Sequence, residues 1–287
     1  MTGTRKAHAA VLFSGGTDST LAAAQMLDEC DRVTLLTFDP GYLLFLGNTR
    51  VHARKLAERF GADRVEHLIL DIRPFIKKIL GVDVAGDLRE FGFNMSSLVC
   101  LGCRLSMHAF AIAWCLEHQV PYLADGSIRA QSTIPEQMES VIRRNRRFYS
   151  QEYGIRHFSP IYEESESDRR LDELGIAGKK RLKKQFILFD TQATCVFGVP
   201  ADVYGRLFYG KLVGDTREAD SEQYCAEKYP VMQDTIRETL AGTGIDVPAA
   251  AEGLRAIRRR DGDLGASQSP GGDAAFDRAL DPSIDGR

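Results

Sequence analysis

The sequence predicts an α/β fold built on a parallel β-sheet, and two observations lead to that prediction. Over the first 125 positions, short apolar or β-branched runs alternate with segments of helical pattern. A glycine-rich turn joins the first run to the first helix. Strands separated by helices form βαβ units, in which neighbouring strands run in the same direction. A chain of 287 residues is long enough to bury one large core or two modest ones.

Each element of the expected sheet is an apolar run of strand length. The expected strands are Ala9–Phe13, Val33–Phe38, Val65–Ile72, Val120–Ala124 and the less regular Ile155–Ile161. In the helix expected over Thr49–Phe60, Val51, Leu56, Ala57 and Phe60 lie near one face, and Gly61 suits its C-cap. The other expected helices are Thr20–Glu29, Leu105–His118, 136–148, Asp168–Gly175, Lys179–Phe186 and Glu218–Leu240, the last with a break at Pro230.

Periodicity fades from about Gly242, where glycine, alanine, aspartate and proline dominate. We therefore expect residues 1–165 to form a catalytic domain and 166–241 a helical extension of the same unit. Residues 242–287 are expected to be a disordered tail.

The chain has 44% apolar residues, which is ordinary for a globular protein, and a net charge of −3. Its overall charge therefore does not favour binding to nucleic acid. No long uncharged apolar stretch and no N-terminal leader pattern is present, which predicts a cytoplasmic protein without a membrane span.

The stretch Ser14-Gly-Gly-Thr-Asp-Ser19 predicts a phosphate site. A strand that runs through this turn into a helix aims several backbone N–H groups and the positive helix end at one point. Gly15 and Gly16 let the backbone approach an anion closely, and Ser14 and Ser19 can donate further hydrogen bonds. Asp18 would repel a bare phosphate, so its presence suggests Mg²⁺ between the carboxylate and the phosphate oxygens.

This stretch resembles the pyrophosphate loop, S-G-G-x-D-S, of the N-type (PP-loop) ATP pyrophosphatases. The resemblance implies a doubly wound, mostly parallel five-stranded sheet with ATP across the carboxyl ends of the strands. It also implies cleavage of ATP between the α and β phosphates and adenylation of a substrate oxygen. The residues implied to bind ATP are Ser14, Gly15, Gly16, Thr17, Asp18 and Ser19, with Thr37, Phe38 and Asp39 near adenine and ribose. A plain strand end is the other interpretation of Thr37–Asp39.

Cysteines supply a second signal. The C-x-x-C pair Cys100 and Cys103 is expected just before a helix, and Cys195 follows far downstream. Three thiolates can hold three irons of a [4Fe–4S] cluster and leave the fourth iron open to an exogenous sulfide. Zinc with His108 or Cys225 as a fourth ligand, persulfide chemistry at Cys103 with Cys100 resolving, and no special role all remain open.

A pyrophosphate loop followed by C-x-x-C and a lone cysteine resembles the iron–sulfur tRNA thiolases that make 2-thiocytidine and 2-thioribothymidine. The resemblance implies that Cys100, Cys103 and Cys195 are cluster ligands and that Arg104 steadies a sulfide or a phosphate. It implies a tRNA or a small heterocycle as acceptor and sulfide or a sulfur-carrier protein as donor; a homodimer is left open. Many of these thiolases have Lys at the position of Thr17, and a Gly-His-x-x-Asp-Asp motif where this chain reads Gly126-Ser-Ile-Arg-Ala-Gln131. Asp125 is a candidate replacement for the missing carboxylates.

Two basic segments have two possible roles. They could bind a nucleic-acid backbone, or they could be solvated faces among acidic neighbours; they are Arg143-Arg144-Asn-Arg146-Arg147 and the lysine-rich segment 179–184.

The function expected from the loop and the cysteines is an ATP-dependent sulfurtransferase. An ATP-dependent amide or amine ligase with zinc or no metal at the cysteines is the alternative within the same superfamily. A non-catalytic ATP-binding regulator is the alternative from another class.

Overall fold

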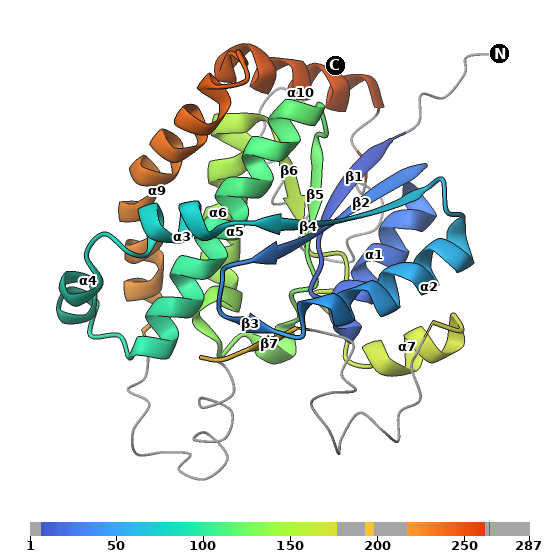
Figure 1. Cartoon of the computed structure of the whole chain (residues 1–287), viewed down its shortest axis with the longest axis horizontal. Helices are drawn as coiled ribbons and strands as arrows, with labels where there is room; N and C mark the ends of the chain where they lie inside the picture. Colours follow the sequence, from blue (N-terminus) through green and yellow to red (C-terminus); the bar gives the residue numbers. More distant parts are fainter. Residues whose placement is uncertain (1–6, 177–192, 198–216, 262–263, 265–287) are drawn as a thin grey trace, which may run out of the picture.

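A five-stranded parallel sheet with strand order β4-β2-β1-β5-β6 forms the centre of the molecule (Figure 1). The structure is a computed structural model that describes residues 7–176, 193–197, 217–261 and 264. The strands are β1 (His8–Leu12), β2 (Arg32–Asp39), β4 (Val65–Asp71), β5 (Tyr122–Ala124) and β6 (Arg156–Phe158). The chain passes from β1 through β2 to β4 in one direction and then from β5 to β6 in the other. The predicted doubly wound α/β fold is thus confirmed, and its switch point lies between β1 and β5.

Helices cover both faces of the sheet because alternate residues of each strand point to opposite sides. In β1, Ala9 and Val11 pack toward one face, while Ala10 and Leu12 pack toward the other. The first face carries α1 (Thr17–Glu29), α2 (Arg50–Phe60) and α7 (Ser167–Glu173) (Figure 1). The second face carries α3 (Arg73–Ile79), α4 (Val84–Phe91), α5 (Met95–His118), α6 (Glu139–Tyr153), α9 (Glu218–Ala241) and α10 (Val247–Asp261).

Helix α5 begins at Met95 rather than at Leu105 as predicted, so Cys100 and Cys103 lie inside the helix and not before it. The side chain of Asn94 caps the helix by accepting a hydrogen bond from the Ser97 backbone N–H at 2.8 Å. Gly102 in the helix interior is explained by packing, because a Cβ there would lie 2.6 Å from Leu80 Cδ1. Helices α3 and α4 were not predicted.

The C-terminal region corrects two further expectations. Helix α9 continues through Pro230, so the expected break is wrong. Residues Val247–Asp261, placed by the sequence analysis in a disordered tail, form the helix α10 with Ala251 and Leu254 buried in the core. Residues 265–287 and the expected helix over residues 179–186 lie outside the described residues.

Outside the main sheet, β3 (Leu43–Leu44) pairs antiparallel with β7 (Thr194–Cys195), with Leu43 opposite Cys195. Three short 3-10 turns complete the described elements: η1 (Leu46–Thr49), η2 (Arg129–Gln131) and η3 (Pro135–Gln137). The β3–β7 pair lies near the carboxyl ends of the sheet strands (Figure 1). It brings Cys195 to the same end of the molecule as the glycine loop.

One described helix, α5, is long and apolar enough to cross a bilayer. However, 72% of its apolar window is buried inside the protein. Leu98, Leu105, Ile112 and Leu116 of this helix are buried in the core. The apolar composition of α5 is therefore explained by its place in the fold.

Candidate active site

The glycine loop connects β1 to α1 and is fixed by hydrogen bonds within itself. Gly15 has a φ of +76°, which favours glycine, and Gly16 is the N-cap residue of α1. The Ser14 backbone N–H donates to Ser19 Oγ at 3.3 Å, and Thr20 Oγ1 donates to the Gly16 carbonyl at 2.7 Å. Among the described residues, no side chain caps the N-terminus of α1. The N-terminal N–H groups of this helix therefore remain suited to a bound anion.

A buried histidine supports the loop from α2. His52 is 2% exposed, and its Nδ1 lies 2.8 Å from the Gly15 carbonyl oxygen. Because a carbonyl only accepts, Nδ1 carries the proton in this contact. His52 was treated in the sequence as one of six histidines without a metal-like spacing, and only the fold brings it beneath the loop.

A cleft of about 480 Å³ opens in front of the loop. That volume is in the usual range for a small-molecule site. It is lined by the glycine loop, the end of β2, α5, the turn after β5, and the β3–β7 pair. The predicted site residues that line it are Ser14, Gly16, Thr17, Asp18, Ser19, Thr37, Phe38, Cys103, Arg104 and Cys195. Gly15, Asp39 and Cys100 are not among the residues that line it.

The side chains at the end of β2 are engaged within the protein. Thr37 Oγ1 donates to the Phe13 carbonyl at 2.6 Å and lies 2.9 Å from His67 Nε2. Asp39 accepts a hydrogen bond from the Gly41 backbone N–H at 2.8 Å and so fixes the following turn. The expected contact of Thr37, Phe38 and Asp39 with a nucleoside stays a prediction.

Cys100, Cys103 and Cys195 come together beside the cleft, with Tyr42 next to them. Burial raises the pKa of the Cys103 thiol to about 11, partly offset by the Tyr42 hydroxyl, and the neighbouring Cys195 raises it further. Burial likewise raises the pKa of Cys100, to which Glu136 and the other two cysteines contribute. Closely placed thiols that are costly to ionise without a partner suit a bound metal centre, which would stabilise their thiolates.

The spacing of these sulfur atoms bears on whether one zinc ion could bind all three cysteines. Among the described residues, only His108, Asp125 and His157 form a group of three whose donor atoms all lie within 4.8 Å of one another. Tetrahedral zinc with Zn–S bonds of about 2.3 Å needs sulfur atoms roughly 3.8 Å apart. The three cysteines do not form such a group, so their sulfur atoms do not all stand at the spacing of one tetrahedral zinc.

The fourth zinc ligands considered in the sequence analysis do not join the cysteines. His108 packs against Tyr149 and His157, with ring centroids 5.0 and 5.1 Å away. Cys225 is fully buried in the core, where burial raises its pKa to about 12. Cys225 is therefore a core residue, and both ring nitrogens of the buried His108 have no hydrogen-bond partner among the described residues.

Asp125, at the end of β5, pairs with Arg104 from α5. Burial alone would raise the pKa of Asp125, but Arg104 and His157 hold it well below its usual range. Asp125 is 1% exposed and also bonds to Ser127 and Ser159. His157 and Ser159 were not predicted as site residues; two polar residues inside the expected strand Ile155–Ile161 were the available signal.

Asp18 lies in the first turn of α1 at the edge of the cleft. Its Oδ2 accepts a hydrogen bond from Gln131 Nε2 at 3.4 Å, and Gln137 in turn donates to Gln131 Oε1 at 2.7 Å. The carboxylate therefore lines the cleft with a neutral amide as its hydrogen-bond partner. It is well placed to coordinate a divalent cation next to the glycine loop.

The basic run on α6 does not present a continuous cationic surface. Arg143 pairs with Glu139, and Arg144 pairs with Glu222. Arg146 is 9% exposed and donates to Ser159 Oγ at 3.1 Å. The acidic neighbours noted in the sequence thus neutralise much of this run, and segment 179–184 lies outside the described residues.

Comparison with known proteins gives one family match and several structural ones. Residues 8–86 match the family model described as queuosine biosynthesis protein QueC. The sequence matches no curated protein. Among solved structures, a 4-thiouridine synthetase in complex with RNA and ATP is similar over 87% of this chain, with 14% identity and a TM-score of 0.50.

The chain spans about half of that synthetase, 53% of its length. A predicted subunit of tRNA methyltransferase from Methanocaldococcus jannaschii is similar over 66% of this chain and 96% of its own length. It has 16% identity and a TM-score of 0.39. The synthetase likeness extends the fold assignment, including the doubly wound sheet, to most of the chain.

Proposed function

The chain has the fold and the N-terminal loop of the PP-loop ATP pyrophosphatase superfamily, and from this premise we propose that it is an ATP-dependent sulfurtransferase. In the proposed reaction, a carbonyl oxygen of the acceptor attacks the α-phosphate of ATP and pyrophosphate leaves. Sulfide then displaces AMP from the adenylated carbon, leaving a C=S bond. Adenylation supplies the driving force, because AMP is a far better leaving group than oxide or hydroxide.

The glycine loop binds the triphosphate in this proposal. The N-terminus of α1 and the hydroxyls of Ser14 and Ser19 offer donors to phosphate oxygens. Asp18 holds Mg²⁺, which neutralises charge on the departing pyrophosphate. Arg104 lines the same cleft and adds a fixed positive charge.

The observation that carries the proposal is the convergence of three cysteines beside the ATP cleft. Two come from α5 and one from β7, and Cys103 and Cys195 line the cleft itself. These three residues would hold a [4Fe–4S] cluster, which supplies an iron site for sulfide when bound. The ATP site and the sulfur source would then both open onto the same cleft.

A tRNA base is the proposed acceptor, with a free heterocycle as the other choice. The 4-thiouridine synthetase whose fold this chain shares was solved with RNA and ATP, which supports an RNA substrate by analogy of fold. Sulfide itself or a sulfur-carrier protein would supply the sulfur. A cytoplasmic location would give the protein access to both the tRNA acceptor and the sulfur donor.

An ATP-dependent ligase remains the second candidate, favoured by one observation. The match to the QueC family ends at residue 86, before any of the three cysteines. It therefore supports the nucleotide-binding half of the site and says nothing of sulfur chemistry. A ligase of this kind would keep its activity when Cys195 is replaced.

Anaerobic purification tests the proposal. We expect brown protein with roughly four irons and four acid-labile sulfides per chain, as a [4Fe–4S] cluster requires. Cys195→Ala should lose the iron and the ATP-dependent thiolation, while Cys115→Ala should keep both, because Cys115 is buried in the core of the same helix as the C-x-x-C pair. Colourless wild-type protein after anaerobic reconstitution would overturn the cluster. Pyrophosphate release that survives in Cys195→Ala with an amine acceptor would favour the ligase.

A further inference from the structure

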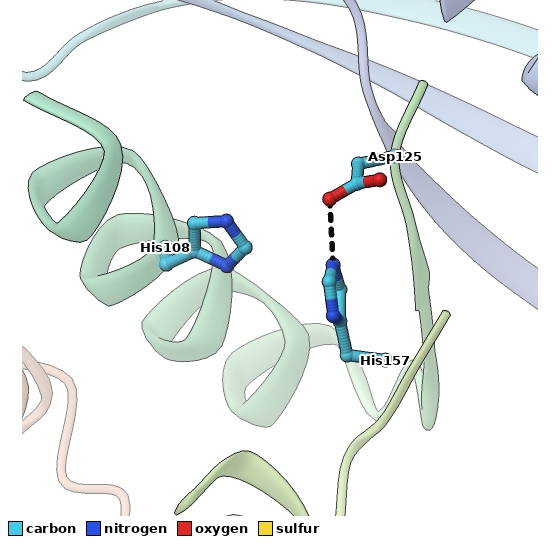
Figure 2. Close-up of side chains that lie close together, drawn as sticks. All are labelled: His108, Asp125 and His157. Carbon is cyan, nitrogen blue, oxygen red and sulfur yellow. Dashed lines mark hydrogen bonds and ion pairs between the residues drawn. The ribbon is translucent and has the colours of Figure 1, made fainter. Parts of the chain in front are cut away.

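A buried polar cluster lies directly behind Arg104. Asp125 stands at the end of β5, His157 lies in the neighbouring β6, and His108 faces both from α5 (Figure 2). Asp125 and His108 are each 1% exposed, and His157 is 5% exposed. The chemistry proposed above uses neither imidazole. A cluster of this kind needs a reason to remain in the core, since buried polar groups are costly.

A metal ion is the first interpretation to consider, because three donor atoms of this cluster lie within 4.8 Å of one another. The hydrogen bonds of Asp125 argue against it. Its Oδ1 accepts from the Ser127 N–H at 2.9 Å and from Ser159 Oγ at 2.6 Å. Its Oδ2 accepts from Arg104 and from His157 Nε2 at 3.1 Å.

A carboxylate offers about four lone-pair sites, and all are used here. A cation would have to displace the guanidinium and then face its charge. The Asp125 carboxylate is therefore saturated without a metal, while both ring nitrogens of His108 and Nδ1 of His157 have no hydrogen-bond partner among the described residues.

We propose that Asp125 and His157 are positioning residues that hold the Arg104 guanidinium against the pyrophosphate moiety of ATP. The inference rests on the ATP site of the proposed function and adds residues that neither the loop nor the cysteines indicate. His157 holds the Asp125 carboxylate from behind, and the carboxylate in turn fixes Arg104. Figure 2 shows the His157 ring bonded to Asp125 and the His108 ring standing apart from it.

Close contact between the turn after β5 and the glycine loop places this anchor at the phosphate site. A Cβ on Gly126 would lie 2.6 Å from the Ser19 backbone nitrogen, so the residue next to Asp125 touches the start of α1. Among the described residues, Arg104 makes its hydrogen bonds through Nη2 alone, to Asp125 and to Ser127 Oγ at 3.1 Å. Its other N–H groups are left for a ligand in the cleft, which Arg104 lines.

The charges around Asp125 fit this role. Arg104 pairs with it directly, and Arg146 reaches it through Ser159. Burial keeps both imidazoles neutral by lowering the pKa of His108 and of His157, although Asp125 opposes the shift at His157. Arg104, Arg146 and Asp125 therefore sum to one net positive charge, and the carboxyl group of Glu136 also lies near Arg104.

Pyrophosphate binding separates positioning from simple charge. Asp125 is an anion near a site for anions, so charge alone predicts that Asp125→Asn strengthens pyrophosphate binding. Positioning predicts the opposite, because asparagine has one acceptor oxygen where aspartate has two. Its amide NH2 would then face either the donors Arg104 and His157 or the donors Ser127 N–H and Ser159 Oγ. The two accounts therefore differ in the sign of the effect.

The experiment measures dissociation constants of Mg²⁺–pyrophosphate, Mg²⁺–ATP and AMP by calorimetry on the full chain. We expect Asp125→Asn and Arg104→Ala each to weaken pyrophosphate and ATP binding at least tenfold and to leave AMP binding unchanged. His157→Gln keeps an N–H donor near Nε2 and should bind like wild type, whereas His157→Leu should weaken pyrophosphate binding. His108→Leu is the matched control, because His108 is equally buried yet makes no hydrogen bond to Asp125.

Equal or tighter pyrophosphate binding by folded Asp125→Asn would overturn the inference and leave the proposed ATP site intact. Equal effects of His157→Leu and His108→Leu would also overturn it, since packing alone would then explain both. If Asp125→Asn does not fold, the comparison of these two histidine variants decides. Failure of wild type to bind Mg²⁺–ATP would instead reject the proposed function.

Discussion

Gly126 shows how closely two segments must approach to build the phosphate site. A Cβ at this position would lie 2.6 Å from the Ser19 nitrogen and 2.8 Å from the Asp18 carbonyl carbon, both of them backbone atoms. Neither atom can move without shifting the start of α1. A side chain at residue 126 is therefore excluded by contact, in a segment whose sequence departs from the thiolase pattern.

Gly126→Ala should destabilise the protein by about 1–3 kcal/mol, the usual cost of overpacking, and weaken ATP binding. Urea unfolding and ATP calorimetry measure the two effects. Gly242→Ala is the control, since its nearest neighbour to a new Cβ is the Thr239 carbonyl oxygen at 3.8 Å and its φ is −67°. The prediction is wrong if both variants unfold at the same urea concentration and bind ATP equally.

Residues differ in how far the sequence could predict their roles. The glycine loop was predictable because all its groups are neighbours in the chain and their chemistry is local. Asp125, His157 and Ser159 are brought together only by pairing of β5 with β6, a contact that no spacing in the sequence encodes. Thr37 lines the cleft with its hydroxyl hydrogen-bonded to Phe13 and His67, and its place near the nucleoside stays a prediction.

At the scale of elements, α5 links the core to the site. Its C-terminal half is buried beneath the sheet, while its N-terminal half carries Cys100, Cys103 and Arg104. The sequence predicts a helix that starts at Leu105, after the C-x-x-C pair, whereas α5 starts at Met95. The cap at Asn94 and the packing of Gly102 against Leu80 stabilise the additional turns.

Asn94→Ala should lower the free energy of unfolding by about 1 kcal/mol, the usual cost of losing an N-cap side chain. Because the cap precedes Cys100 by less than two turns, fraying should also lower cluster occupancy. Asn94→Ser preserves a capping oxygen and should match wild type in both respects. Chemical denaturation and iron content are the measurements, and an unaltered Asn94→Ala variant would contradict the role of the cap.

On the scale of the whole molecule, buried histidines make stability depend on pH. Burial lowers the pKa of His8 and of His67 to about 4, and it also lowers the pKa of His108 and His157. In the unfolded chain these groups titrate near 6.5. Between the two values the unfolded state binds more protons, so the free energy of unfolding falls as the pH drops from about 6.5 to about 4.

Urea unfolding at pH 7.5 and at pH 5 should show this loss of stability. His67→Gln keeps a donor toward Thr37 but cannot take up a proton, so it should lose less stability between the two pH values than wild type. An identical loss in both proteins would show that His67 does not contribute.

The sequence predicted that the strands are parallel, but it did not predict their order in the sheet. Alternation of strands and helices implies parallel pairing, and that is what the chain adopts. The helix α10 could not be predicted, because its alanine-rich start resembles the low-complexity sequence that follows it. Its stability comes from burial of Ala251 and Leu254 in the core, and that contact is not visible in the sequence.

The central position of β1 also has a consequence for synthesis of the chain. Its partner β2 follows soon after, but its other edge pairs with β5, whose residues Tyr122–Ala124 are made much later. Until then one edge of this largely apolar strand keeps unpaired backbone N–H and C=O groups on the nascent chain, and such edges recruit other chains. Long-range parallel pairing is also slow to form. A chaperone that shields this edge during synthesis should therefore raise the yield of folded protein.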